Sequence, residues 1–182
     1  MRLTTKGGNV IGKTRSFILC YLIFFSSSIF AEDIAGFWKT IDDETHMPRS
    51  IVAIYEYQKK YYGRLIATYD DNGKIYDSIE KPIKRAPAVK GNPYYVGLDF
   101  MWELEKHGKK FTNGVILDPE KGFEYSASAW IDDKGDLTLR GEMFFLGKNQ
   151  TWPKAVDADF PQGFIKPDLK TLVPKIPEVI EN

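Results

Sequence analysis

Strand-length apolar segments, repeated along the chain and separated by short polar turns, are the sequence feature that most constrains the fold. No window shows the sustained 3.6-residue periodicity of an amphipathic helix. Turns such as 118–122 and 132–135 are too short for a parallel crossover, so neighbouring strands must be antiparallel. The pattern predicts an all-β chain with strands at 35–41, 50–57, 61–69, 96–105, 111–117, 123–131, 136–143 and 144–152.

Apolar residues alternate along several of these segments, which gives each strand one buried and one solvated face. Two such faces are expected to hold Val96, Leu98, Phe100, Trp102 and Leu104 in one strand, and Phe123, Tyr125, Ala127, Ala129 and Ile131 in another.

Glycines in or near the predicted strands indicate repeated bends, which close a small sheet into a barrel. They are Gly63, Gly97, Gly114, Gly141 and Gly147. An antiparallel up-and-down barrel of about eight strands has an interior that side chains fill or that holds one small ligand. Small inward residues favour an open interior, whereas filling by Trp38, Trp102 or Trp130 is the alternative.

The first 31 residues resemble a secretory leader. Nine apolar residues at 17–25 follow Lys13 and Arg15 and precede a stretch of small residues that ends at Ala31. The segment is too short for a membrane span of about 20 residues. We expect a signal peptide at 1–31, cleavage after Ala31, and a periplasmic or secreted protein with no stable membrane span after cleavage.

The remaining 151 residues carry 21 bases against 25 acids and contain no cysteine, because Cys20 lies in the leader. A net charge of −4 argues against nucleic-acid binding, which needs a clustered positive field. Without disulfides, the core must hold the fold. One domain is expected, at 32–154.

Two segments interrupt the strand pattern. A loop at 70–95 contains five bases and three prolines, and it is either a solvated excursion or a lid over one mouth of the barrel. A proline-rich tail at 155–182 is expected to be extended, with parts docked on the barrel through apolar residues. Those residues are Phe160, Phe164, Ile165, Leu169, Leu172, Val173 and Ile176. Either segment is a possible surface for a protein partner.

Sites for catalysis are scarce in the sequence. His46 and His107 are the only two histidines, so neither a metal site nor a cofactor is predicted. Asp42, Asp43 and Asp118 stand in turn-like sequences that need no catalytic explanation. We expect that the protein is not an enzyme, and a carboxylate-dependent hydrolase is the less favoured alternative.

Arg140 lies within a late predicted strand and needs a partner if its guanidinium is buried. Three roles stay open for it: pointing outward, packing on an aromatic ring such as Trp38, and holding the anionic head of a ligand.

Several motifs appear in the order typical of a bacterial domain-of-unknown-function family, numbered 2147, which the chain resembles over about 34–154. They are Gly36-Phe37-Trp38, Ser50-Ile51-Val52 with Gly63, Asp118-Pro119 with Gly122 and Tyr125, Leu139-Arg140-Gly141, and Gly147 with Gln150-Thr151-Trp152.

The resemblance implies a small secreted protein of Gram-negative bacteria with a lipocalin-like (calycin-like) barrel and no established activity. The Gly-x-Trp opening is similar to that of lipocalins, which implies that Trp38 plugs one end of the barrel with Arg140 as its partner. The chain departs from the family at Trp152-Pro153-Lys154, where a Trp-x-Arg ending is usual, and in a 70–95 loop without cysteine.

The leading hypothesis is therefore a non-enzymatic binder of a small apolar or amphipathic ligand. Its candidate ligand-binding residues are Trp38, Tyr55, Phe100, Trp102, Tyr125 and Arg140. The alternative is an envelope scaffold whose barrel is filled and which acts through the loop or the tail.

Overall fold

The structure, a computed structural model, describes residues 1–3, 33–144 and 146–180. The chain divides into two units, Met1–Phe30 and Ala31–Asn182, and the strands found in the described residues belong to the second. The predicted signal peptide, with its cleavage site after Ala31, lies outside the described residues apart from 1–3.

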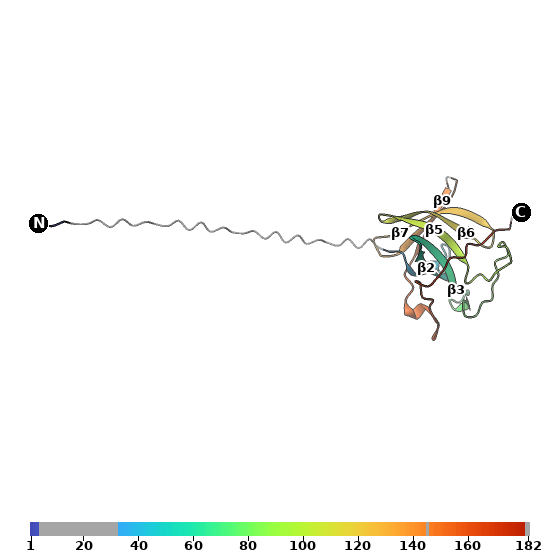
Figure 1. The fold of residues 1–182 in the computed structure, drawn as a ribbon. Coiled ribbons are helices and arrows are strands. Elements are labelled where there is room, and N and C mark those ends of the chain that lie inside the picture. The colour runs from blue at the N-terminus through green and yellow to red at the C-terminus, as the bar shows by residue number, and fades with distance from the viewer. Residues whose placement is uncertain (4–32, 145, 181–182) are drawn as a thin grey trace. The chain divides into compact units, whose positions relative to one another are not determined.

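One antiparallel sheet contains all the strands in the described part of the chain (Figure 1). They are β1 (Gly36–Ile41), β2 (Pro48–Tyr57), β3 (Lys60–Tyr69), β4 (Ile75–Ser78), β5 (Asp99–His107), β6 (Lys110–Asp118), β7 (Phe123–Ile131), β8 (Leu137–Met143) and β9 (Leu146–Trp152). Their order in the sheet is β1-β2-β3-β5-β6-β7-β8-β9, and the short β4 pairs with β3 outside this path.

The sheet curls until its last strand meets its first. Just beyond β9, the carbonyl of Pro153 accepts a hydrogen bond of 2.9 Å from the amide of Lys39, and the amide of Ala155 donates one of 2.9 Å to the carbonyl of Phe37. Trp38 and Lys154 form an antiparallel bridge between these bonds. The fold is therefore a nearly closed, eight-stranded antiparallel barrel, and the predicted fold class is confirmed.

The predicted shared face of the strand at 96–105 is wrong. Leu98 and Trp102 pack in a cluster outside the barrel, whereas Phe100 and Leu104 pack inside it. The register between β3 and β5 shifts twice, and Glu103 has a φ of 62°. Each irregularity moves the following side chains to the opposite face of the strand, so a simple alternation cannot assign them.

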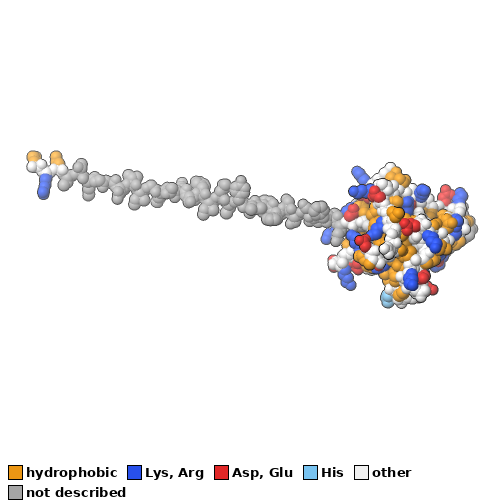
Figure 2. Space-filling model, turned by 90° about the horizontal axis from the view of Figure 1, so that it is seen from below, with side chains coloured by type: hydrophobic (Ala, Val, Ile, Leu, Met, Phe, Trp, Pro, Cys, Tyr) orange, Lys and Arg blue, Asp and Glu red, His pale blue; other side chains and the backbone are white. Residues whose placement is uncertain are grey.

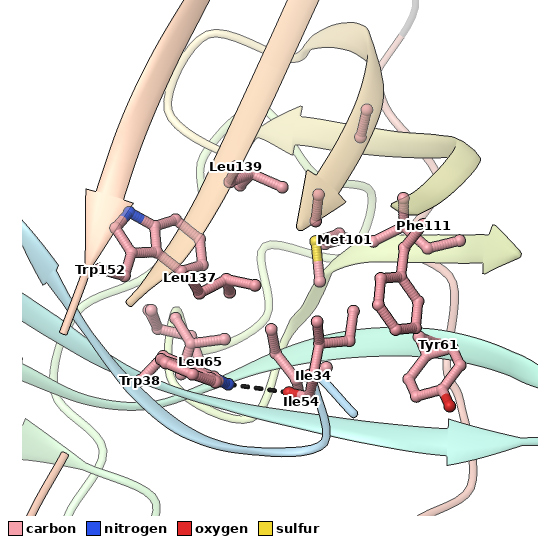
Figure 3. Packing of buried hydrophobic residues seen from close by; sticks show 14 of the residues in the cluster. Ile34, Trp38, Ile54, Tyr61, Leu65, Met101, Phe111, Leu137, Leu139 and Trp152 are labelled. Carbon is pink, nitrogen blue, oxygen red and sulfur yellow. Dashed lines mark hydrogen bonds between the residues drawn. The ribbon is translucent and has the colours of Figure 1, made fainter. Parts of the chain in front are cut away.

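The core fills the part of the barrel interior around Trp38 (Figure 3). The indole Nε1 of Trp38 donates a hydrogen bond of 2.8 Å to the carbonyl of Ile34. Gly114 belongs to the same layer, where an added Cβ would lie 2.6 Å from Leu104 Cδ2, so only glycine fits without a shift. Leu139 and Trp152 complete this core from β8 and β9, at the start of the open part of the interior.

The outer face of the barrel is covered on one side by the 70–95 loop and the tail. One outer cluster joins Tyr55, Tyr62 and Trp102 to Val89 of the loop and Leu172 of the tail. A second outer cluster, on β2 and β3, packs against tail residues; it consists of Ile51, Ala53, Ile66 and Ala67 with Phe37, Phe160, Phe164 and Leu169. In Figure 1 the tail runs across the outside of the strands, with one 3-10 turn at Asp157–Asp159.

Docking of the tail is therefore partial. Phe160, Phe164, Leu169 and Leu172 contact the barrel, whereas Ile165, Val173 and Ile176 stay largely exposed.

Candidate functional site

A cavity of about 710 Å³ occupies the barrel interior at the end away from Trp38 and opens to solvent there. The mouth is formed by the turns that follow β1 and β6, by the 70–95 loop and by β9. At this level Gly141 of β8 adds no side chain to the interior, which leaves space beside Ile116 and Tyr125.

One wall of the cavity is apolar. Phe100, Ile116 and Tyr125 contribute from β5, β6 and β7, and Leu139 and Trp152 lie next to them. Gly141 leaves room between them, since an added Cβ would meet Ile116 Cγ2 at 3.7 Å and Tyr125 Cβ at 3.8 Å, which are ordinary contacts.

The wall on β1, β2 and β3 is polar. Thr40, Ser50 and Thr68 are cross-strand neighbours and form a row of three hydroxyls, which we call the hydroxyl row. Thr40 Oγ1 and Ser50 Oγ are 2.6 Å apart and hydrogen bond to each other. Thr68 is only 7% exposed, and its Oγ1 has no hydrogen-bond partner among the described residues.

Ion pairs surround the mouth. Arg49 Nη1 lies 2.7 Å from Asp42 Oδ2, and Lys148 Nζ of β9 lies 2.5 Å from Asp43 Oδ2. Lys84 of the long loop pairs with Glu120 of the turn after β6. The rim therefore joins the turn after β1 to β9, and the long loop to the turn after β6.

The partners of the rim acids lower their pKa values. The pKa of Asp42 lies below its ordinary value because its carboxylate accepts hydrogen bonds from the Thr45 amide and from Arg49. The pKa values of Asp43 and Glu120 are lowered first by the hydrogen bonds from Lys148 and Lys84. These acids therefore stay ionised and paired at neutral pH.

The loop residues Tyr76, Lys84 and Tyr95 line the mouth, so part of the 70–95 loop belongs to the site. The Lys84 Nζ lies 4.5 Å from the centroid of the Tyr95 ring. Burial raises the pKa of Tyr95, with the charge of Glu120 acting in the same direction, so its hydroxyl remains a hydrogen-bond donor.

Of the three acids considered for catalysis, Asp42 and Asp118 stabilise turns, and Asp43 pairs with Lys148 at the mouth. Asp42 Oδ1 accepts hydrogen bonds from the amides of Glu44 and Thr45. Asp118 Oδ1 accepts them from the amides of Glu120 and Lys121 at 3.0 and 3.2 Å. This side-chain capping is the ordinary chemistry of aspartate at the first position of a turn. The described residues contain no group of three or more His, Cys, Asp or Glu side chains placed to hold a metal ion.

Of the six candidate ligand-binding residues, Phe100 and Tyr125 line the cavity. Trp38 lies in the core beyond its closed end, 2% exposed. Tyr55 and Trp102 face away from the interior and belong to the outer cluster under the loop and tail. Ligand binding by any of the six remains a prediction.

Arg140 does not pack on Trp38. Its Nη1 donates to Asn149 Oδ1 at 3.0 Å, and its Nε pairs with Glu142, so it lies on the outer face of β8. The cation near the Trp38 ring is Lys154, with its Nζ 6.0 Å from the ring centroid. Ring closure explains this position, because Lys154 follows β9 directly and forms the antiparallel bridge with Trp38 of β1.

The sequence reasoning missed the hydroxyl row and Trp152. A usable signal was present, because Thr40 lies two residues after Trp38, and Ser50 two residues before Val52, so each shares the inward face of its strand.

Tyr55 takes part in a second polar cluster, on the outer face of the barrel. Its hydroxyl donates to Asp99 Oδ1 at 2.9 Å and accepts from Arg64 Nη2 at 3.2 Å. Burial raises the pKa of Tyr55, and the charge of Asp99 raises it further. This cluster holds the tail, and none of its three residues lines the cavity.

Charges of both signs are interspersed with apolar side chains on the face shown in Figure 2. No helix among the described residues has the length and apolar character needed to cross a bilayer.

Residues 36–154 match the bacterial family described as "Uncharacterized protein conserved in bacteria (DUF2147)". Among solved structures, the chain is similar to protein HP1028 from the human pathogen Helicobacter pylori, which is described as belonging to the lipocalin family. The TM-score is 0.56 with 20% identity, covering 70% of this chain and 86% of that one. At this identity the likeness shows the fold alone. No curated protein matches the sequence significantly.

Proposed function

The chain belongs to the DUF2147 family of bacterial proteins, and we propose that it is a non-enzymatic carrier that binds one small apolar or amphipathic molecule inside its barrel. The observation that carries this proposal is the cavity of about 710 Å³, open at one end and walled by Phe100, Ile116 and Tyr125. Small-molecule sites in proteins usually have volumes of about 300–1,000 Å³, and this cavity falls within that range. Its lining is mixed, because the apolar wall faces the hydroxyl row and charged side chains surround the mouth.

The compartment we propose is the periplasm or the extracellular space. The support is the leader-like sequence of 1–31, with its basic start, apolar centre and small-residue end.

The cavity also bears on the alternative, a scaffold with a filled interior. That role needs no space in the barrel, whereas Gly141 of β8 leaves room beside Ile116 and Tyr125 at the level of the cavity. The open interior therefore favours the carrier.

Filling the cavity tests the proposal. Gly141→Leu would place its side chain between Ile116 and Tyr125, where an added Cβ meets only ordinary contacts. The matched control, Ser126→Leu, adds the same side chain at an exposed position of β7. Binding is measured with the uncharged fluorescent probe N-phenyl-1-naphthylamine, and folding is checked by urea unfolding.

We expect Gly141→Leu to weaken probe binding at least about tenfold at unchanged stability, while Ser126→Leu binds like the unsubstituted protein. Equal binding by both variants, or no binding by the unsubstituted protein, would contradict the carrier proposal.

A further inference from the structure

We propose that the cavity selects an amphiphile with an uncharged, hydroxyl-bearing head, which the hydroxyl row of Thr40, Ser50 and Thr68 receives. This inference rests on the proposed carrier function and adds the chemical class of the ligand.

The buried hydroxyl of Thr68 has no hydrogen-bond partner among the described residues. A buried hydroxyl without a partner is unfavourable, and native proteins rarely keep one. Thr68 lines the cavity and is 7% exposed, and its neighbour Ser50 already hydrogen bonds to Thr40. Thr68 Oγ1 is thus the member of the row whose hydrogen-bonding capacity is not used by another described residue.

The charged side chains that line the cavity lie at its mouth. All four basic residues that line the cavity are on the rim and face a carboxylate that also lines it. The pairs are Arg49 with Asp42, Lys84 with Glu120, Lys121 with Asp118, and Lys148 with Asp43. With Glu44 included, five acids oppose four bases, so the mouth carries a formal charge of −1.

An anionic head would therefore have to displace a carboxylate from its partner at the mouth, or enter the interior with no cation to receive it. Burying an unpaired charge of either sign is far more costly than burying a hydroxyl that finds a hydrogen bond.

The hydroxyls of the row can hydrogen bond to an uncharged head that bears a hydroxyl. A threonine or serine hydroxyl donates one hydrogen bond and accepts others, so it pairs with an alcohol in either direction. The apolar wall on β5, β6 and β7 lies across the ring from the row on β1, β2 and β3, so one molecule can place its head on one wall and its chain against the other.

Three ligands of equal chain length separate the head-group chemistries: decanol, decanoate and decylamine. At pH 7 the acid is ionised and the amine protonated, because their pKa values lie near those of ordinary carboxyl and amino groups. Calorimetric titration of the purified protein with each gives the three dissociation constants. We expect decanol to bind at least about tenfold more tightly than either charged ligand, a difference of about 1.4 kcal/mol or more.

Three variants test the role of Thr68. Thr68→Val keeps the shape and removes the hydroxyl, Thr68→Ser keeps the hydroxyl, and Thr151→Val makes the same exchange at an exposed position of β9. Thr68→Val should weaken decanol binding about three- to tenfold and leave the charged ligands unchanged, while the other two variants bind decanol like the unsubstituted protein.

Stability provides an independent readout. Removing an unsatisfied buried hydroxyl should leave the urea midpoint of Thr68→Val unchanged or higher, so binding and stability move in opposite directions. A merely structural role for Thr68 would lower both.

Tight binding of decanoate or decylamine overturns this inference and leaves the carrier proposal standing. The same holds if Thr68→Val leaves the dissociation constant of decanol unchanged. Failure of all three ligands and of the neutral fluorescent probe overturns both. Failure of the three ligands with probe binding retained overturns the inference alone.

Discussion

Arg64 and Asp99 face each other across β3 and β5 and form a two-pronged ion pair, with Nη2 to Oδ2 at 2.7 Å and Nε to Oδ1 at 2.9 Å. Asp99 is fully buried, and both side chains also hold the tail. The amide of Lys175 donates to Asp99 Oδ2 at 2.7 Å, and Arg64 Nη2 donates to the carbonyl of Val173 at 2.8 Å. A single ion pair thus joins two strands to the C-terminal tail.

Asp99→Ala is expected to lower the free energy of unfolding by about 3–5 kcal/mol, because it leaves the guanidinium of Arg64 without its buried partner. The tail should also become sensitive to limited proteolysis near Lys175. The control is Glu178→Ala, which removes the exposed pair with Lys90 and should cost about 0–1 kcal/mol. Equal costs for the two variants would show that the pair does not hold the tail.

Trp38→Ala is expected to cost about 3–5 kcal/mol in urea unfolding, since it opens a void in the core and removes the hydrogen bond to Ile34. Trp130 has the same side chain on the outer face of β7, where Lys110 lies 5.8 Å from its ring centroid. Its replacement by alanine should cost about 1 kcal/mol. A larger loss at Trp130 than at Trp38 would contradict the assignment of the two faces.

Two glycines on the inward face should respond oppositely to alanine. At Gly114 the added Cβ meets Leu104 at 2.6 Å and the carbonyl of Trp102 at 3.1 Å, so we expect a loss of about 1–3 kcal/mol. At Gly141 the nearest atoms are 3.7 Å away. Because alanine reduces the conformational freedom of the unfolded chain, we expect the free energy of unfolding to rise by as much as about 1 kcal/mol. Urea unfolding of both variants checks this; a stabilising change at Gly114 would be incompatible with the close packing.

Lowering the pH should weaken the mouth of the barrel. The pKa values of Asp42, Asp43 and Glu120 are lower in the folded chain than in the unfolded chain, so their pairs stabilise the fold above the ordinary carboxyl values near pH 4 and lose that contribution as the pH falls below them. We expect the free energy of unfolding, measured in urea from about pH 6 to about pH 2, to fall with a slope that Asp42→Asn reduces.

Asp133→Asn is the control for this pH series, because Asp133 is exposed on the turn between β7 and β8. An unchanged slope in Asp42→Asn, or the same reduction in Asp133→Asn, would show that the rim pairs do not cause the dependence.

The sequence predicted the architecture where strands are regular. Between β7 and β8 the register runs without a shift from Ser126 to Ile131, and the inward side chains of Ala127 and Ala129 follow from their alternation. Along β5 two register shifts break the period of two, so Phe100 and Leu104 face inward whereas Trp102, predicted on the same face, faces outward. Local patterning reveals a face only where the backbone keeps its pleat.

The site was less accessible to prediction because its parts meet only in the folded chain. Lys148 and Asp43 are more than 100 residues apart, and so are Lys154 and Trp38. The similarity to lipocalins implied an arginine beside Trp38 and pointed to Arg140, but the residue that ring closure brings there is Lys154. Pairings of this kind depend on how the barrel closes, which no local pattern records.

The closure of the ring has a consequence for the order in which the chain folds. Each pair of neighbouring strands in the order β5 to β9 is joined by a short turn and can form early, whereas the contact of Lys39 with Pro153 spans 114 residues. The first strand must wait for the last one to be synthesised. Between the synthesis of β9 and the closure of the ring, the sheet is open with unpaired edges at β1 and β9. Such an intermediate can pair its edge strands with those of other molecules.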